Sequence, residues 1–155
     1  MPEKNLEALF LHSLKDLYFA EQQIAKAMPA MIGAAESQEL RSAFETHARE
    51  TQEQLRRLEE VFDILGEKPQ GVTCEGILGI LKEAEGIMKT FAGGEAFEAA
   101  LIAAAQSIEH YEIVRYGTLK AWAQELGMPL DRGERRVQLV GGGDDEGVLG
   151  AVGGL

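Results

Sequence analysis

The sequence predicts an all-α protein, a bundle of long helices packed around one core. Apolar residues recur at the i, i+3, i+4 spacing of a helix over three long segments, and glycine or proline marks the ends of these segments. A few carboxylate and imidazole side chains interrupt the apolar stripes at helical spacing. With 155 residues, of which 45% are hydrophobic, the chain is long enough for one domain with a sizeable core.

The first long helix is predicted over residues 5–32. Its buried stripe follows the helical period and carries one carboxylate among apolar side chains. Gly33 marks the turn that follows. Ser37 is a suitable N-cap for the next helix, because its hydroxyl can accept a hydrogen bond from a free backbone N–H. The members of the stripe are Leu14, Leu17, Glu21, Ile24 and Met28.

The second long helix is predicted over residues 38–65. Its apolar stripe contains a histidine, and Glu50 lies on the same side three residues after that histidine. Gly66, Pro69 and Gly71 end the helix and open a connection. The stripe comprises Leu40, Phe44, His47, Thr51, Leu55, Leu58 and Phe62.

A short helix over about 75–91 fills the connection, and a long alanine-rich helix is predicted over residues 95–126. Gly127 and Pro129 stop the long helix. Glu109 borders its apolar face. That face contains Phe97, Leu101, Ala104, Ile108, Glu112, Arg115, Leu119, Trp122 and Leu126.

The last part of the chain differs in kind from the rest. We therefore divide the chain into a helical bundle, residues 1–130, and an atypical glycine-rich tail, residues 131–155. Glycines recur from position 141 to position 154. Each glycine inside a helix costs about 1 kcal/mol relative to alanine, so we predict no helix past about residue 140.

Composition argues against several kinds of partner. The formal net charge is −11 without a cluster of Lys and Arg, which disfavours nucleic acid and an anionic membrane. No apolar stretch approaches the roughly 20 residues of a transmembrane helix, and the N-terminus lacks the pattern of a signal peptide. The single cysteine, Cys74, can form no internal disulfide. We expect a soluble cytoplasmic protein.

Five residues are candidate metal ligands: Glu21, His47, Glu50, Glu109 and Glu112. Buried carboxylate and imidazole groups are costly without a partner, and a metal ion is the usual partner when several lie on the inward stripes of separate helices. The short loop between the first two helices makes them antiparallel, so positions about 13 residues before and after the turn lie level. Glu21 and the His47–Glu50 pair satisfy this condition. The pattern predicts a dinuclear metal site.

Each candidate also has a more ordinary interpretation. Glu21 taken singly is more often partly exposed or paired with Lys or Arg, and His47 is more often a hydrogen-bonded core histidine. Arg115 could simply pair with Glu112 or Glu109. The combination at matching depth favours the metal site. A catalytic Cys74 and a phosphate-binding glycine loop find less support.

Five segments of the chain resemble the YciE/YciF family of ferritin-like bacterial stress-response proteins. They are LYFAEQQ at 17–23, HARET at 47–51, RLEEVF at 57–62, CEGILGILKE at 74–83 and AAQSIEHYEIVRYGTL at 104–119, the last being the most specific. The likeness covers residues 5–130. It implies a ferritin-like four-helix bundle with a crossover helix, a homodimer, and a dinuclear iron site that could also take another divalent metal.

Position by position, the resemblance supports the same five ligands and implies ferroxidase-type oxidation of Fe(II). Glu83, in the short helix, also matches a family position, where we expect a structural role. The family continues after residue 127 with a fourth long helix that carries a pair of glutamates. This chain has LVGGG at 139–143 instead, so the fourth helix and any ligands on it are in doubt.

Two functions from different classes follow. The first is a ferritin-like di-iron protein that takes part in stress response and oxidises Fe(II). The alternative is a metal-free structural or regulatory helical dimer. A missing fourth helix favours the alternative, because an uncovered apolar stripe must be buried against something. In a dimer we expect contacts near the third long helix, such as Leu119 and Trp122.

Overall fold

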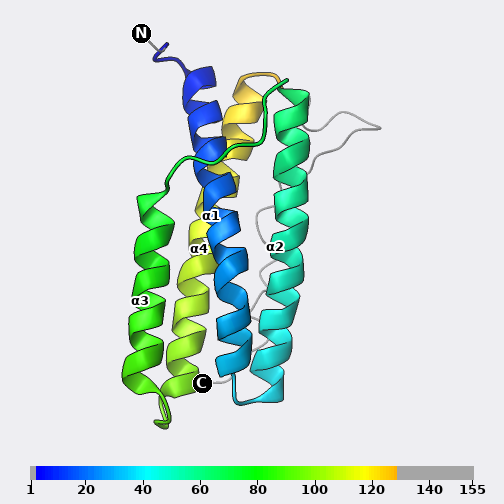
Figure 1. Ribbon diagram of the computed structural model, residues 1–155. Coiled ribbons are helices and arrows are strands. Elements are labelled where there is room, and N and C mark those ends of the chain that lie inside the picture. Colours follow the sequence, from blue (N-terminus) through cyan, green and yellow to red (C-terminus); the bar gives the residue numbers. More distant parts are fainter. Residues whose placement is uncertain (1–2, 129–155) are drawn as a thin grey trace.

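The computed structural model describes residues 3–128, which form four helices and no β-strand (Figure 1). The helices are α1 (Leu6–Ala34), α2 (Gln38–Ile64), α3 (Glu75–Phe91) and α4 (Phe97–Glu125). The predicted all-α class is confirmed, and each observed helix end lies within two residues of its predicted position. The predicted glycine-rich tail and the question of a fourth long helix fall outside the described residues.

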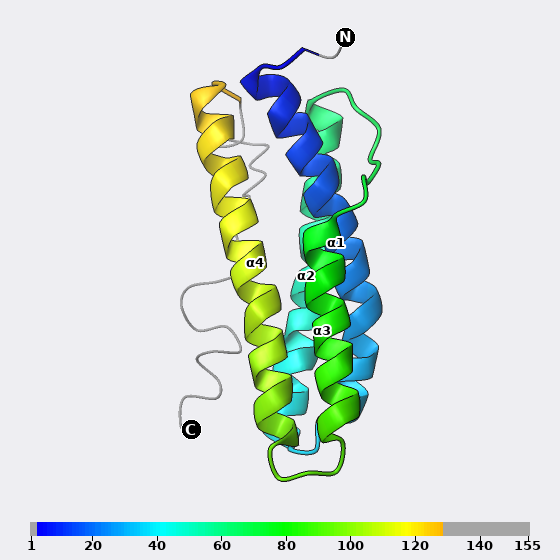
Figure 2. The same ribbon diagram turned by 90° about the vertical axis from the view of Figure 1, so that its left-hand side faces the viewer.

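The helices are arranged as two antiparallel pairs with α1 at the centre. α1 packs against each of the other helices, and α3 packs chiefly against α4. Figures 1 and 2 together place α4 behind α1, with α2 and α3 on opposite sides of α1. α1, α2 and α4 are therefore the long bundle helices, and α3 is the shorter crossover helix.

The connection between α2 and α3 crosses over α1 and is fixed to it. The backbone N–H of Val72 donates to the carbonyl of Lys15 on α1 at 3.2 Å. A Cβ atom at Gly71 would lie only 2.9 Å from Cβ of Phe19, so this close approach requires glycine. Because this connection crosses over α1, both α3 and α4 pack against α1 from the side away from α2 or from behind it.

Side chains cap the helices where the sequence predicted their ends. Asn5 accepts a hydrogen bond from the N–H of Ala8, and Ser37 accepts one from the N–H of Leu40. Glu98, at the start of α4, also accepts from the backbone N–H groups of Glu36 and Ser37 at 2.9 and 2.5 Å. This carboxylate ties α4 to the α1–α2 turn.

The core is formed by the predicted apolar stripes. Each fully buried large apolar side chain stabilises the fold by about 1.5–3 kcal/mol relative to exposure. Four charged or titratable positions on the stripes were also predicted, and three of them are buried within this core: Glu21, His47 and Glu112. Its fully buried members include Phe10, Leu14, Leu17, Ile24, Phe44, Leu58, Phe62, Leu101 and Ile108.

The fourth position, Arg115, departs from its predicted place on the buried face of α4. Its side chain is 39% exposed and lies 3.7 Å from Oδ2 of Asp16 on α1. The guanidinium also stacks over the ring of Tyr111, 5.1 Å from the ring centroid. Arg115 thus forms an ion pair with Asp16 of α1, a partner that the sequence analysis did not consider.

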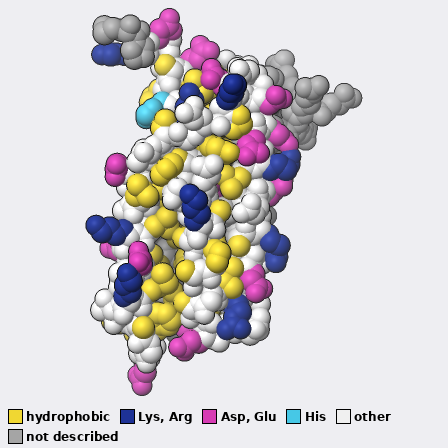
Figure 3. All heavy atoms as spheres, viewed as in Figure 1, with side chains coloured by type: hydrophobic (Ala, Val, Ile, Leu, Met, Phe, Trp, Pro, Cys, Tyr) yellow, Lys and Arg dark blue, Asp and Glu magenta, His cyan; other side chains and the backbone are white. Residues whose placement is uncertain are grey.

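The surface seen in Figure 3 mixes charged and apolar side chains. Hydrophobic side chains form a band along the length of this face, and charged side chains lie scattered around and across it. No helix within residues 3–128 is both long enough and apolar enough to span a bilayer.

Candidate metal centre

Glu21 of α1 is fully buried and lies in the middle of the bundle. Its side chain is 0% exposed, which the ordinary interpretation of a partly exposed glutamate does not allow. Oε1 accepts a hydrogen bond from the Tyr116 hydroxyl of α4 at 2.6 Å. Oε2 is buried and has no hydrogen-bond partner among the described residues. A buried carboxylate oxygen in this state is costly unless a proton or a cation satisfies it.

His47 of α2 and Glu112 of α4 are buried opposite each other. His47 Nε2 lies 3.1 Å from Glu112 Oε2, and the two side chains are 6% and 7% exposed. With Nε2 as the donor, Nδ1 is left as an acceptor, and it has no hydrogen-bond partner among the described residues. This geometry fits a hydrogen-bonded core histidine and a metal ligand equally well.

The three buried side chains influence one another's protonation. Burial raises the pKa of the Glu21 carboxyl well above its usual range, and the neighbouring charge of Glu112 raises it further. Burial acts to lower the pKa of His47, but the hydrogen bond and charge of Glu112, with the charges of Glu109 and Glu50, raise it overall. The centre therefore carries an excess of negative charge that a proton or a bound cation can balance.

Glu109 and Glu50 lie at the margin of this group. Oε1 of Glu109 is 4.0 Å from His47 Nδ1, and the Glu109 side chain is 14% exposed. Glu50 is exposed on α2, and its contribution in this structure is its charge beside His47. The structure thus brings Glu21, His47 and Glu112 together, with Glu109 beside them and Glu50 further out. The role of each as a metal ligand stays a prediction.

The two residues between Glu109 and Glu112 point elsewhere. His110 is exposed, with its Nδ1 2.9 Å from the backbone carbonyl of Gln106. Tyr111 faces α3 and α1 instead, where its hydroxyl lies 2.8 Å from Cys74 Sγ and 3.3 Å from Asp16 Oδ2. Because successive helix residues are rotated by about 100°, only the outer members of this run can face the centre.

Tyr116 is the residue of the site that the sequence analysis missed. Its side chain is 1% exposed, and its hydroxyl is bonded to Glu21. An aromatic residue on an apolar, alanine-rich helix usually belongs to the core. The signal was its position four residues after Glu112, which puts both residues on one face of α4.

The group fits a metal ion in its chemistry but is not pre-arranged around one. Within residues 3–128, no three His, Cys, Asp or Glu side chains already converge in a ligand geometry. They are paired with one another instead, through the His47–Glu112 and Tyr116–Glu21 hydrogen bonds. The fit rests on the unpartnered Oε2 of Glu21 and Nδ1 of His47, in a set of carboxylate and imidazole donors that suits a divalent transition metal.

Comparison with known proteins identifies the family. Residues 5–134 match the family described as domain of unknown function DUF892. Protein YciF of Escherichia coli is 38% identical over 128 residues, which is 82% of this chain and 77% of YciF.

Two solved structures share the fold. A Rhodopseudomonas palustris protein, named YcfI and provisionally described as a structural protein, is 49% identical with a TM-score of 0.79, over 81% of this chain and 80% of its own. The E. coli stress protein YciF is 37% identical with a TM-score of 0.76, over 81% and 79% of the two chains. The chain therefore belongs to the DUF892 family of YciF-like helical-bundle proteins.

Proposed function

We propose that the chain binds a dinuclear metal centre, with iron as the resident metal, between α1, α2 and α4. The observation that carries this proposal is the placement of Glu112. It contacts His47 of α2 directly, and its charge acts on the buried Glu21 of α1, so it is near donors from both of the other helices. A carboxylate in that position would hold a metal ion together with donors from the other two helices, as carboxylates do in other di-iron bundles.

The proposed roles follow from the atoms that remain available. Glu21 would bind through Oε2, and His47 would bind through Nδ1, since its Nε2 contacts Glu112. Oε1 of Glu109 lies 4.0 Å from Nδ1 of His47, so Glu109 would bind the metal ion on the same side of the centre as His47. Glu50, exposed at the margin, is the weakest candidate and would act as an outer ligand or draw cations toward the centre.

The chemistry of such a centre is ferroxidase-type. Bound ferrous iron would supply electrons to O₂ or peroxide, and a role in stress response would follow from the removal of these species. The residues of the chain exclude water around Glu21, which is 0% exposed. They also exchange protons, because the proton favoured on the Glu21 carboxyl must leave when a cation binds.

The test is an anaerobic Fe(II) titration of the metal-free chain, followed by aeration. We expect about two iron ions per chain, a rise in melting temperature, and growth of ferric absorbance on aeration. Glu112→Gln should lose all three responses, whereas Glu45→Gln, at an exposed position of α2, should keep them. A wild-type chain whose melting temperature and iron content do not respond to Fe(II) would contradict the proposal.

A metal-free helical dimer is the second candidate function, and exposed apolar residues favour it. On α4, Ile113 and Val114 are 47% and 64% exposed. Leu119, which we expected at a dimer contact, is 1% exposed and packs inside the chain, while Trp122 is partly buried. Light scattering on the wild type and on Val114→Lys tests this candidate. A dimer that becomes a monomer in the variant supports it, and a wild-type monomer rejects it.

A further inference from the structure

The hydroxyl of Tyr116 makes one specific contact, and it is with the most deeply buried carboxylate. Tyr116 is 1% exposed, Glu21 is 0% exposed, and the two side chains join α4 to α1. The distance of 2.6 Å from Oη to Oε1 is typical of a hydrogen bond from an O–H donor to a carboxylate, which is among the stronger hydrogen bonds in proteins. This contact is therefore a fixed element of the centre.

The contact makes the two oxygens of Glu21 inequivalent. Oε1 is occupied by the phenol, while Oε2 has no hydrogen-bond partner among the described residues. A carboxylate that is free on both oxygens can rotate and bind a metal through one oxygen or both. A carboxylate held on one side by a phenol presents its other oxygen in a defined direction.

The surroundings keep Tyr116 in its protonated form. Burial raises the pKa of its hydroxyl well above the usual range, and the charge and hydrogen bond of Glu21 and the charge of Glu112 raise it further. The charge of Arg57 on α2 acts in the opposite direction. The phenol is thus a hydrogen-bond donor to the centre, and its conversion to a phenolate ligand is disfavoured.

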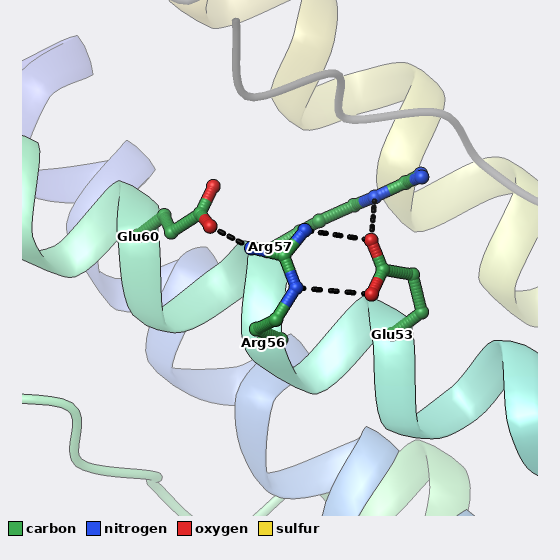
Figure 4. A network of polar contacts seen from close by, with 4 residues as sticks. All are labelled: Glu53, Arg56, Arg57 and Glu60. Atoms are coloured by element: carbon green, nitrogen blue, oxygen red, sulfur yellow. Dashed lines mark hydrogen bonds and ion pairs between the residues drawn. The ribbon is translucent and has the colours of Figure 1, made fainter. Parts of the chain in front are cut away.

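Arg57 is itself held in place along α2. Its Nε donates to Glu53 Oε1 at 3.1 Å, and Figure 4 shows Arg56 and Arg57 both bonded to that carboxylate, with Arg57 extended away from Arg56. Hydrogen bonding from Arg56 lowers the pKa of Glu53 to about 2, so this anchor stays ionised. The guanidinium of Arg57 is therefore part of a partly exposed network of charges on α2, outside the centre.

We propose that Tyr116 is a positioning residue that occupies Oε1 of Glu21, so that Glu21 binds metal through Oε2 alone. This inference rests on the proposed metal centre. It adds a restriction that the centre alone does not require, namely single-oxygen binding by Glu21, and it assigns that restriction to one hydroxyl group.

The test uses Co(II), whose visible spectrum reports its coordination. Wild type, Tyr116→Phe and Tyr18→Phe are titrated with Co(II), and affinity and spectrum are recorded. Tyr18 is the matched control, because it is also a buried tyrosine of the core, 8% exposed, but bonds to Glu59 away from the centre. We expect Tyr116→Phe to weaken Co(II) binding by about tenfold to hundredfold and to change the spectrum. Tyr18→Phe should match the wild type in both.

The outcomes separate this inference from the proposed function. If the wild type binds Co(II) and Tyr116→Phe binds it with the same affinity and spectrum, the role of Tyr116 is overturned and the proposed metal centre is not. Wild type that binds no Co(II) overturns both. A near-ultraviolet difference spectrum of the wild type needs no variant to fold. Appearance of tyrosinate on Co(II) binding would mean that the Tyr116 hydroxyl no longer donates to Oε1 of Glu21, and it overturns the inference. Absence of tyrosinate supports the inference.

Discussion

Replacement of Glu21 by glutamine should stabilise the metal-free chain and abolish its response to metal. Glu21→Gln keeps the shape of the side chain and keeps an oxygen that can accept the Tyr116 hydroxyl. It removes a carboxyl group that is 0% exposed. Burial is the main cause that disfavours the charged form of this carboxyl, and the negative charge of Glu112 is the next. The amide can also donate toward Glu112, where two carboxylates previously repelled each other.

The expected gain follows from the cost of a buried charge without a full set of partners. Replacing such a group by a neutral one of similar volume stabilises a protein by roughly 1–3 kcal/mol. In a chain of this length each kcal/mol shifts the melting temperature by about 2–4 °C, so we expect a rise of about 2–12 °C near neutral pH. Wild type, by contrast, should gain about 2.7 kcal/mol from a divalent metal at a hundredfold excess over Kd.

The pH dependence of the gain gives a second check. The pKa of Glu21 is raised in the folded state. The contribution of its protonated carboxyl to the stability of the wild type is therefore fully present below the usual pKa of 4.5, and it is lost as pH rises through the folded-state pKa. The advantage of Glu21→Gln should therefore be smallest in acid and grow toward neutral pH. Thermal melts of both chains, with and without Fe(II), measure this. An equal melting temperature at all pH values, or a variant that responds to Fe(II), refutes the reasoning.

Three further predictions concern His47, Glu50 and the core residue Leu58. His47 also has a raised pKa, so its contribution to the stability of the metal-free chain is present below pH 6.5 and is lost above the folded value; melts from pH 5 to pH 9 should show a decline. Glu50→Gln should weaken Fe(II) binding by less than Glu112→Gln does, because Glu50 is exposed; calorimetric titration compares the two. Leu58→Ala should cost about 2–5 kcal/mol in denaturant unfolding, since Leu58 is 0% exposed.

The helices and their facing stripes could be predicted from the sequence because helical periodicity is a local property. The short turn after α1 also predicted that Glu21 and His47 lie at the same height along the two antiparallel helices. Both side chains are buried in the structure. The family resemblance then supplied the expectation of iron, which no periodicity contains.

Other features could not be predicted, because they depend on how wide the buried stripe of each helix is. Glu50 lies three residues after His47 and therefore about 60° away around α2, enough to place it at the exposed edge. α4 is apolar on several sides, so its buried faces could not be separated, and Arg115 was misplaced. Tyr116 was missed because the partner of its hydroxyl lies on another helix, 95 residues earlier in the chain.

The most direct test of the metal centre is anomalous diffraction at the iron edge from crystals of this chain grown with Fe(II). The account predicts iron density within bonding distance of Glu21, His47 and Glu112, with the Tyr116–Glu21 hydrogen bond retained. Iron found only on exposed carboxylates, with none at the three buried side chains, would contradict it.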